Sequence, residues 1–198
     1  MATRLQSEAR LSPSVAILDT IQNCQCNLAV WERPPIDGLG ALVQGTQRDL
    51  RFSTDCDTLT PKLTSELARA GYAASPLLDA LVDDIGELAI VFSDLVSARR
   101  IELRLEVVTT DSCRKFHADY VTARLITTYT GRGTQWLDHS DAARIQKGIE
   151  PRNIRALQAG DVGIFKGKMA TDQPAIHRSP PIGGTGEKRL LLVINPGE

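Results

Sequence analysis

This chain has few histidines and few aromatic residues, and it has almost no excess of either charge. The 198 residues include 3 histidines and 4 cysteines, and aromatic residues make up 5%. With 23 basic against 24 acidic residues the net charge is -1, which gives no electrostatic reason to expect a nucleic acid or an anionic membrane as a partner. No apolar run approaches the roughly 20 residues of a transmembrane helix, and the N-terminus lacks a signal-peptide core. We therefore expect a cytoplasmic protein.

The few cysteines match no familiar cross-link. Cys24 and Cys26 form a C-x-C pair, whereas Cys56 and Cys113 stand alone. This is neither a disulfide framework nor a zinc knuckle, because no second ligand pair lies at a suitable spacing. We expect reduced thiols, whose role the sequence does not define.

The length suffices for a single domain over residues 1–198, and the N-terminal part, residues 1–100, is expected to be mostly helical. Three predicted helices begin with a Ser or Thr followed by Pro, the residues that suit the N-cap and the first helical position. The first two cover residues 13–21 and 61–70, and the third begins at Ser75-Pro76, with its apolar residues spread over 78–96. Apolar residues recur at helical spacing along the third, which we expect to cover one face of a sheet.

Residues 101–198 are expected to form a β-barrel core that carries the site, because the hydrophobic period changes there from helical to alternating. Residues 140–147 fit either a helical turn or a loop. The sequence thus predicts an α+β fold, a jelly-roll or related barrel with N-terminal helices packed outside it. The predicted strands are 26–31, 101–109, 117–129, 134–138, 154–157, 161–166, 174–178 and 188–194.

His117 and Asp119 are the first candidate metal ligands. Alternate side chains of a strand share a face, so this imidazole and this carboxylate would converge on one point. A facial metal site needs a third ligand from elsewhere in the chain. His177, on a later predicted strand, is the favoured third ligand, and His139, in a polar loop, is the alternative.

Arg189 opens an apolar strand in phase with Leu191 and Val193, which predicts that it faces inward. A buried arginine needs an anion, and its planar guanidinium can take both oxygens of a carboxylate. The alternative is a solvated arginine at the barrel mouth. Tyr129 would share the face of the ligand pair, provided that strand 117–129 has no bulge.

The pattern His117-x-Asp119, then His177, then Arg189 resembles the signature of the iron(II)- and 2-oxoglutarate-dependent oxygenases. Their fold is a double-stranded β-helix of the cupin type, and the resemblance covers about residues 101–196. The C-terminal half also resembles an uncharacterised family of bacterial domains of unknown function.

The resemblance implies His117, Asp119 and His177 as ligands of Fe(II), and Arg189 as the contact for the C5-carboxylate of 2-oxoglutarate. It suggests Tyr129 as a second contact to that carboxylate. The small-molecule co-substrate would chelate the metal, and oxygen would then serve to oxidise a substrate that the sequence does not identify.

Arg124, Arg132 and Trp136 are candidates for the substrate rim, although residues 131–134 also fit a hairpin turn. Two other functional classes stay open. The same three ligands would suit zinc or iron in a non-catalytic, cupin-like protein of metal sensing or homeostasis. They would also suit an isomerase or hydrolase that uses the metal as a Lewis acid. An inward Arg189 favours the oxygenase, since a pure metal binder has no need of it.

Overall fold

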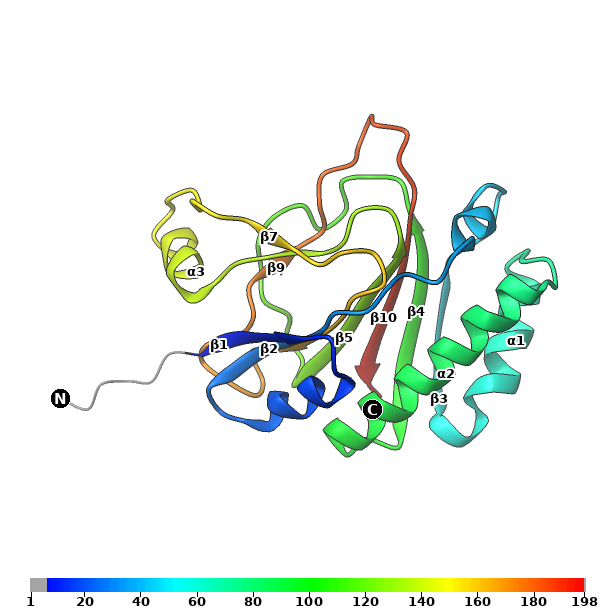
Figure 1. Cartoon of the computed structure of the whole chain (residues 1–198), viewed down its shortest axis with the longest axis horizontal. Helices are drawn as coiled ribbons and strands as arrows, with labels where there is room; N and C mark the ends of the chain where they lie inside the picture. Colours follow the sequence, from blue (N-terminus) through cyan, green and yellow to red (C-terminus); the bar gives the residue numbers. More distant parts are fainter. Residues whose placement is uncertain (1–6, 198) are drawn as a thin grey trace.

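The computed structural model describes residues 7–197, which fold into two β-sheets and several helices (Figure 1). The larger sheet has the strand order β1-β2-β8-β5-β10-β4-β3, and the smaller has the order β7-β6-β9. Neighbouring strands are antiparallel throughout, apart from the parallel pair of β1 and β2. The strands are β1 (Glu8–Ser12), β2 (Cys26–Trp31), β3 (Leu50–Asp55), β4 (Arg100–Val108), β5 (Ala123–Thr130), β6 (Gln135–Trp136), β7 (Arg155–Ala156), β8 (Val162–Lys166), β9 (His177–Arg178) and β10 (Arg189–Pro196).

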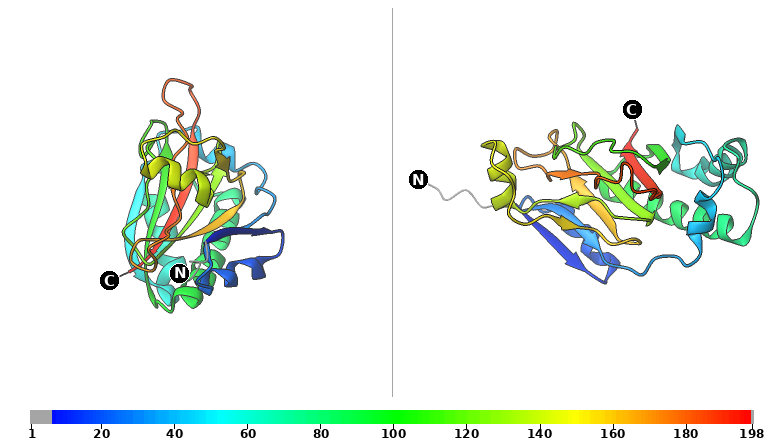
Figure 2. Two further views of the ribbon diagram at one scale, coloured as in Figure 1. Left: turned by 90° about the vertical axis from the view of Figure 1, so that its left-hand side faces the viewer. Right: turned by 90° about the horizontal axis from the view of Figure 1, so that it is seen from above.

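Two longer helices lie together at the β3 end of the molecule, and a third lies at the opposite end near β1 (Figures 1 and 2). The longest begins after Ser75, whose hydroxyl accepts a hydrogen bond from the Leu78 backbone at 3.2 Å, with proline in the first turn. The helices are η1 (Val15–Gln22), η2 (Leu39–Val43), η3 (Cys56–Thr58), α1 (Leu59–Arg69), α2 (Pro76–Val96) and α3 (His139–Gln146), where η marks a 3-10 helix. No helix within residues 7–197 has the length and apolar character needed to cross a bilayer.

The larger sheet buries both of its faces. One face packs against α1, α2 and η1, and we call this the helix-side core; Leu125 and Ile194 belong to it. The other face packs against the smaller sheet and its connections, and we call this the inter-sheet core; Ile126 and Val193 belong to it. Alternate residues of one strand therefore serve two different cores.

The predicted helices largely hold. The long helix over 78–96 and the helix over 61–70 are confirmed as α2 and α1, and the undecided stretch 140–147 is α3. The stretch 13–21 is a 3-10 helix, Val15–Gln22. The description of residues 1–100 as mostly helical is incomplete, because this part also supplies three strands.

The sequence predicted β2 and missed β1 and β3. All three strands join the larger sheet, with β3 at one edge and β1 at the other. The N-terminal part thus extends the sheet as well as covering it. The α+β class is confirmed, whereas the strand pairs within residues 7–197 form two separate sheets and no closed ring.

The prediction of one strand over 117–129 is wrong in its first half. β5 begins only at Ala123, and the stretch before it makes a single isolated bridge, between His117 and His177. The backbone of this stretch is bonded instead to the turn after β8: Lys168 N–H donates to the Asp119 carbonyl at 2.9 Å, and Met169 N–H to the Val121 carbonyl at 3.1 Å. These bonds replace the pairing that a continuous strand would need.

Candidate metal centre

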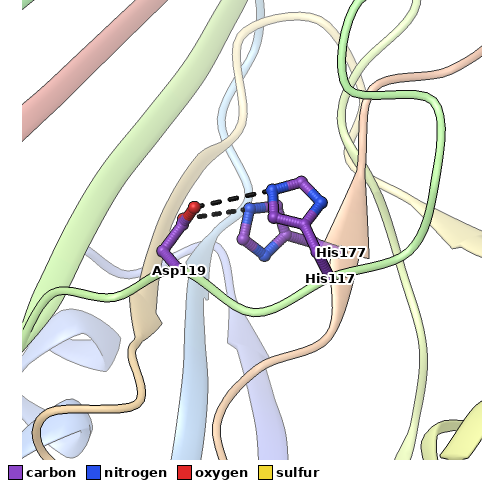
Figure 3. A group of neighbouring side chains, drawn as sticks. All are labelled: His117, Asp119 and His177. Carbon is purple, nitrogen blue, oxygen red and sulfur yellow. Dashed lines mark ion pairs between the residues drawn. The ribbon is translucent and has the colours of Figure 1, made fainter.

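His117, Asp119 and His177 come together beside the inter-sheet core (Figure 3). One ligand atom from each lies within 4.8 Å of the others. The distance is 3.5 Å from His117 Nε2 to Asp119 Oδ1 and 3.2 Å from His177 Nε2 to Asp119 Oδ2. The structure thus brings together the three residues that the sequence proposed as ligands. His139 lies apart from them, at the start of α3.

The backbone explains why the two imidazoles converge. His117 and His177 exchange both of their main-chain hydrogen bonds, each at 2.9 Å, as an antiparallel pair. Side chains of such a pair project from the same face. Their ring centroids are 4.8 Å apart, and the Phe165 ring packs against His177 at a centroid distance of 4.7 Å.

Each imidazole is also held by its second nitrogen. His117 Nδ1 is 2.9 Å from the Lys115 carbonyl oxygen, and His177 Nδ1 is 3.3 Å from the Ala175 carbonyl oxygen. A carbonyl only accepts hydrogen bonds, so both contacts place the proton on Nδ1. That tautomer directs the Nε2 lone pair toward Asp119, as in protein metal sites where a backbone carbonyl orients the ligand.

The Asp119 carboxylate is strongly stabilised in its charged form. Burial alone would raise its pKa, but the hydrogen bonds that His117 and His177 donate from Nε2 when they are protonated, together with the charge of Arg124, hold the pKa well below its usual range. In turn, the hydrogen bond with Asp119 raises the pKa of His117. While the imidazoles are neutral, Asp119 Oδ2 is buried without a hydrogen-bond donor among the described residues. Two imidazole nitrogens and an ionised carboxylate with one unengaged oxygen fit a divalent metal ion.

Arg189 is a buried cation, and none of the described acidic side chains forms an ion pair with it. Its side chain is 0% exposed, and it faces the same side of β10 as predicted. Its Nε donates to the Arg132 carbonyl at 2.5 Å, Nη1 to the Ser179 hydroxyl at 3.2 Å and Nη2 to the Thr128 hydroxyl at 3.3 Å. All three acceptors are neutral. Burial therefore lowers the pKa of the guanidinium to about 10, and nearby acidic side chains offset only part of this.

A cavity of about 410 Å³ opens beside the two histidines. Aliphatic side chains of β5 and β10 line its floor, and Arg104 and Glu106 of β4 line one side. Ser179, which binds the Arg189 guanidinium, is also in the wall, so Arg189 lies just behind the lining. His117 and His177 thus line a hollow between the two sheets, and the Arg189 guanidinium lies behind its wall.

Tyr129 does not belong to this hollow, and its expected place beside the ligands is corrected. The irregular stretch before β5 breaks the alternation that started at His117, so Tyr129 falls in the helix-side core at 2% exposure. Its hydroxyl donates to Asp84 Oδ2 on α2 at 2.7 Å.

The three residues proposed for the rim have different surroundings. Arg124 lines the cavity and contacts Asp119 directly, with 2.6 Å between Nη1 and Oδ1. Arg132 is exposed and pairs with Glu187. Trp136 is buried in the inter-sheet core under the Arg155 guanidinium, away from this cavity.

Sequence reasoning missed Asn195, whose Oδ1 accepts a hydrogen bond from Arg124 Nε at 2.7 Å. A usable signal existed. Asn195 is in phase with Arg189 along β10, so the alternation that predicted an inward arginine also predicts an inward amide. Ser179 and Thr128 carried no such signal, because their role appears only once Arg189 is located.

Several solved structures resemble this fold. A dioxygenase for auxin oxidation from rice matches with a TM-score of 0.51 and 11% identity, covering 96% of this chain and 83% of that chain. A candidate oxygenase from Shewanella oneidensis matches with a TM-score of 0.51 and 12% identity, covering 97% of this chain and 90% of that chain. At such low identity these likenesses concern the fold alone.

A third match, dioxygenase for auxin oxidation 1 from Arabidopsis thaliana, has a TM-score of 0.49 and 12% identity. It covers 83% of this chain, which spans only 65% of that enzyme.

No curated protein matches the sequence. The chain itself belongs to the family described as "Protein of unknown function (DUF1826)", whose profile matches residues 12–195. The match reaches well into the N-terminal half, which the earlier resemblance did not cover.

Proposed function

We propose that this protein is a metal-dependent oxygenase that uses Fe(II) and 2-oxoglutarate to oxidise a substrate not yet identified. One observation carries the proposal: two of the three clustered candidate ligands line a hollow, and a buried arginine lies behind its wall, bonded to the lining residue Ser179. The oxygenase fold of the similar structures supports it. On this proposal residues 1–198 form one domain, and the two sheets are the walls of a double-stranded β-helix.

The ligands would be His117 and His177 through Nε2, and Asp119 through Oδ2. The carbonyls of Lys115 and Ala175 keep the proton on Nδ1 of each imidazole and so leave Nε2 free for the ion. A ferrous ion bound there would supply redox chemistry with oxygen, for which the protein contributes orientation and exclusion of water.

Arg189 would bind the distal carboxylate of 2-oxoglutarate. An anion would neutralise the buried guanidinium, and the hydroxyls of Ser179 and Thr128 could donate to its oxygens. Between that point and the ligands the cavity floor is aliphatic, with Ile126 and Leu191 among its residues. This suits the methylene groups of a five-carbon dicarboxylate.

The test is anaerobic addition of Fe(II) and then 2-oxoglutarate, followed by visible absorption. Chelation of the keto acid to Fe(II) gives a charge-transfer band. We expect the band for the wild-type protein and none for His177→Ala, which lacks a ligand. Arg189→Ala should retain Fe(II) but weaken 2-oxoglutarate binding at least tenfold, or by about 1.4 kcal/mol. His139→Ala is the matched control and should behave as wild type.

Absence of the charge-transfer band, together with tight and stoichiometric binding of zinc, would contradict the proposal. It would favour the non-catalytic metal-binding protein, for which the same two imidazoles and carboxylate are good zinc ligands. Arg189 is what argues against that candidate, because metal binding alone leaves a buried cation without a partner.

A further inference from the structure

Arg124 is bound at both ends of its guanidinium, and one of those ends touches a proposed metal ligand. We infer that Arg124, held in place by Asn195, restricts Asp119 to a single metal-binding oxygen and so keeps an additional coordination position of the ion open. The use of that open position rests on the proposed function, whereas the way in which Asp119 binds the ion does not.

The contacts fix Arg124 firmly. Its side chain is 18% exposed, Nη1 lies 2.6 Å from Asp119 Oδ1, and Nε donates to Asn195 Oδ1 at 2.7 Å. Asn195 is itself buried, at 6% exposure, on the neighbouring strand β10. A guanidinium has several donors in one rigid plane, so binding Asn195 through Nε determines where Nη1 points.

The two oxygens of Asp119 consequently differ. Oδ1 forms a short ion pair with the Arg124 guanidinium, which takes up part of its capacity as an acceptor. Oδ2 is buried, accepts no hydrogen bond among the described residues and lies 3.2 Å from His177 Nε2. A metal ion placed between the imidazoles would therefore meet one carboxylate oxygen that Arg124 does not contact and one that already faces the guanidinium.

This difference decides how many positions remain for other molecules. An octahedral ion with two imidazoles and a one-oxygen carboxylate keeps about three of its positions open, whereas a two-oxygen carboxylate would leave about two. A keto acid that chelates through two atoms would fill both in the second case. Arg124 would thus be a positioning residue that keeps room for oxygen beside the co-substrate.

Arg124 could instead serve only to balance the charge of a buried carboxylate. The two roles predict different results for Asn195→Leu, which leaves the Arg124 charge in place but releases its Nε. Charge balance predicts normal coordination in that variant. Positioning predicts that Oδ1 becomes partly free to bind the ion.

The experiment loads the protein with Mn(II) alone and counts bound water molecules by EPR line broadening in ¹⁷O-enriched water. We expect about three waters for wild type, about two for Arg124→Met and an intermediate value for Asn195→Leu. Arg124→Lys, which keeps a cationic donor, should recover part of the wild-type value. Arg104→Met is the matched control, because Arg104 lines the same cavity but pairs with Glu106.

A wild-type count of about two, or the same count in wild type, Arg124→Met and Asn195→Leu, would overturn the inference. A fall in Arg104→Met as large as in Arg124→Met would overturn it as well. If Arg124→Met does not fold by circular dichroism, Asn195→Leu decides. Should the water counts follow expectation while 2-oxoglutarate gives no charge-transfer band, the proposed function fails and the role of Arg124 stands.

Discussion

At the scale of single residues, Arg189 and Tyr129 are both buried, but their polar groups have different kinds of partner. Among the described residues, the Arg189 guanidinium donates to neutral acceptors, so its charge is left for an anion to neutralise. The Tyr129 hydroxyl is matched by the Asp84 carboxylate, which also binds Arg33. Burial raises the pKa of Tyr129 well above its usual value, so the phenol stays neutral and donates. A satisfied group of this kind stabilises the fold without inviting a ligand.

Replacement of Tyr129 by Phe tests that assignment. The change removes one hydrogen bond to a charged acceptor and should lower the free energy of unfolding by about 1–3 kcal/mol, measured in urea. Binding of 2-oxoglutarate should not change, because Tyr129 lies on the opposite face of the sheet. A loss of co-substrate affinity at unchanged stability would contradict this placement.

The residues of the site were partly predictable, and the reason is geometric. The inward orientation of Arg189 was predicted correctly because β10 pairs with β4 in an unbroken register from the arginine to Val193. Tyr129 was misplaced because the same rule was carried from His117 across a stretch that is not a strand. Periodicity can position a side chain only as far as the backbone stays regular.

At the scale of elements, the segment that carries Asp119 depends on the turn after β8. Gly167 approaches it so closely that a Cβ at this position would lie 2.1 Å from the Val121 carbonyl oxygen. No sequence pattern indicates which glycine will face another backbone. The backbone contacts of residues 113–122 could therefore not be predicted from the sequence. The residue types of the candidate ligands could be.

Gly167→Ala should displace this segment and with it the carboxylate. We expect metal affinity to fall at least tenfold, or by about 1.4 kcal/mol, in a competition titration with a metal-sensitive dye. Gly40→Ala is the control, because a Cβ at Gly40 meets no atom within 4 Å. Unchanged affinity in Gly167→Ala would show that the segment can adjust without moving Asp119.

A second contact between elements is sensitive to pH. Asp111, in the connection from β4 to β5, accepts backbone N–H bonds from Gly183 at 2.6 Å and Ile182 at 2.8 Å, in the connection from β9 to β10. The bond from Gly183 is the main reason that the pKa of Asp111 is lowered. The stabilisation is therefore present above the ordinary pKa of an aspartate, about 3.9, and is lost as pH falls through the lower value in the folded state.

NMR can follow this contact directly. The amide proton shifts of Ile182 and Gly183 should titrate together with a midpoint below about 3.9, and Asp111→Asn should abolish the titration. A midpoint at or above the ordinary value would mean that the carboxylate gains nothing from these bonds.

At the scale of the whole molecule, a buried ion pair joins the helices to the sheet. Arg33, in the connection after β2, lies 2.5 Å from Asp84 of α2 through Nη1, and its Nε donates to the Gly160 carbonyl at 2.7 Å. The two side chains are 13% and 10% exposed. One network thus links α2, the connection after β2 and the turn before β8, which supports the face of the sheet opposite the candidate site.

Asp84→Ala should be strongly destabilising, because it leaves the Arg33 charge buried and unpaired. We expect a loss of about 3–5 kcal/mol in urea unfolding. The double variant Asp84→Leu with Arg33→Met should lose less than Asp84→Ala, since neither charge remains. A loss below roughly 1 kcal/mol for Asp84→Ala would place this pair among ordinary surface ion pairs.

The main-chain pairing of His117 with His177 has a thermodynamic consequence. These residues are remote along the polymer and meet through one isolated bridge, so an ion gripped by both imidazoles would act as a reversible cross-link. Because such an ion binds the native state and not the separated halves of its site, its concentration should raise the melting temperature by mass action. Removal of the ion by a chelator should then destabilise the connection between β4 and β5 first, and the rest of the molecule only later.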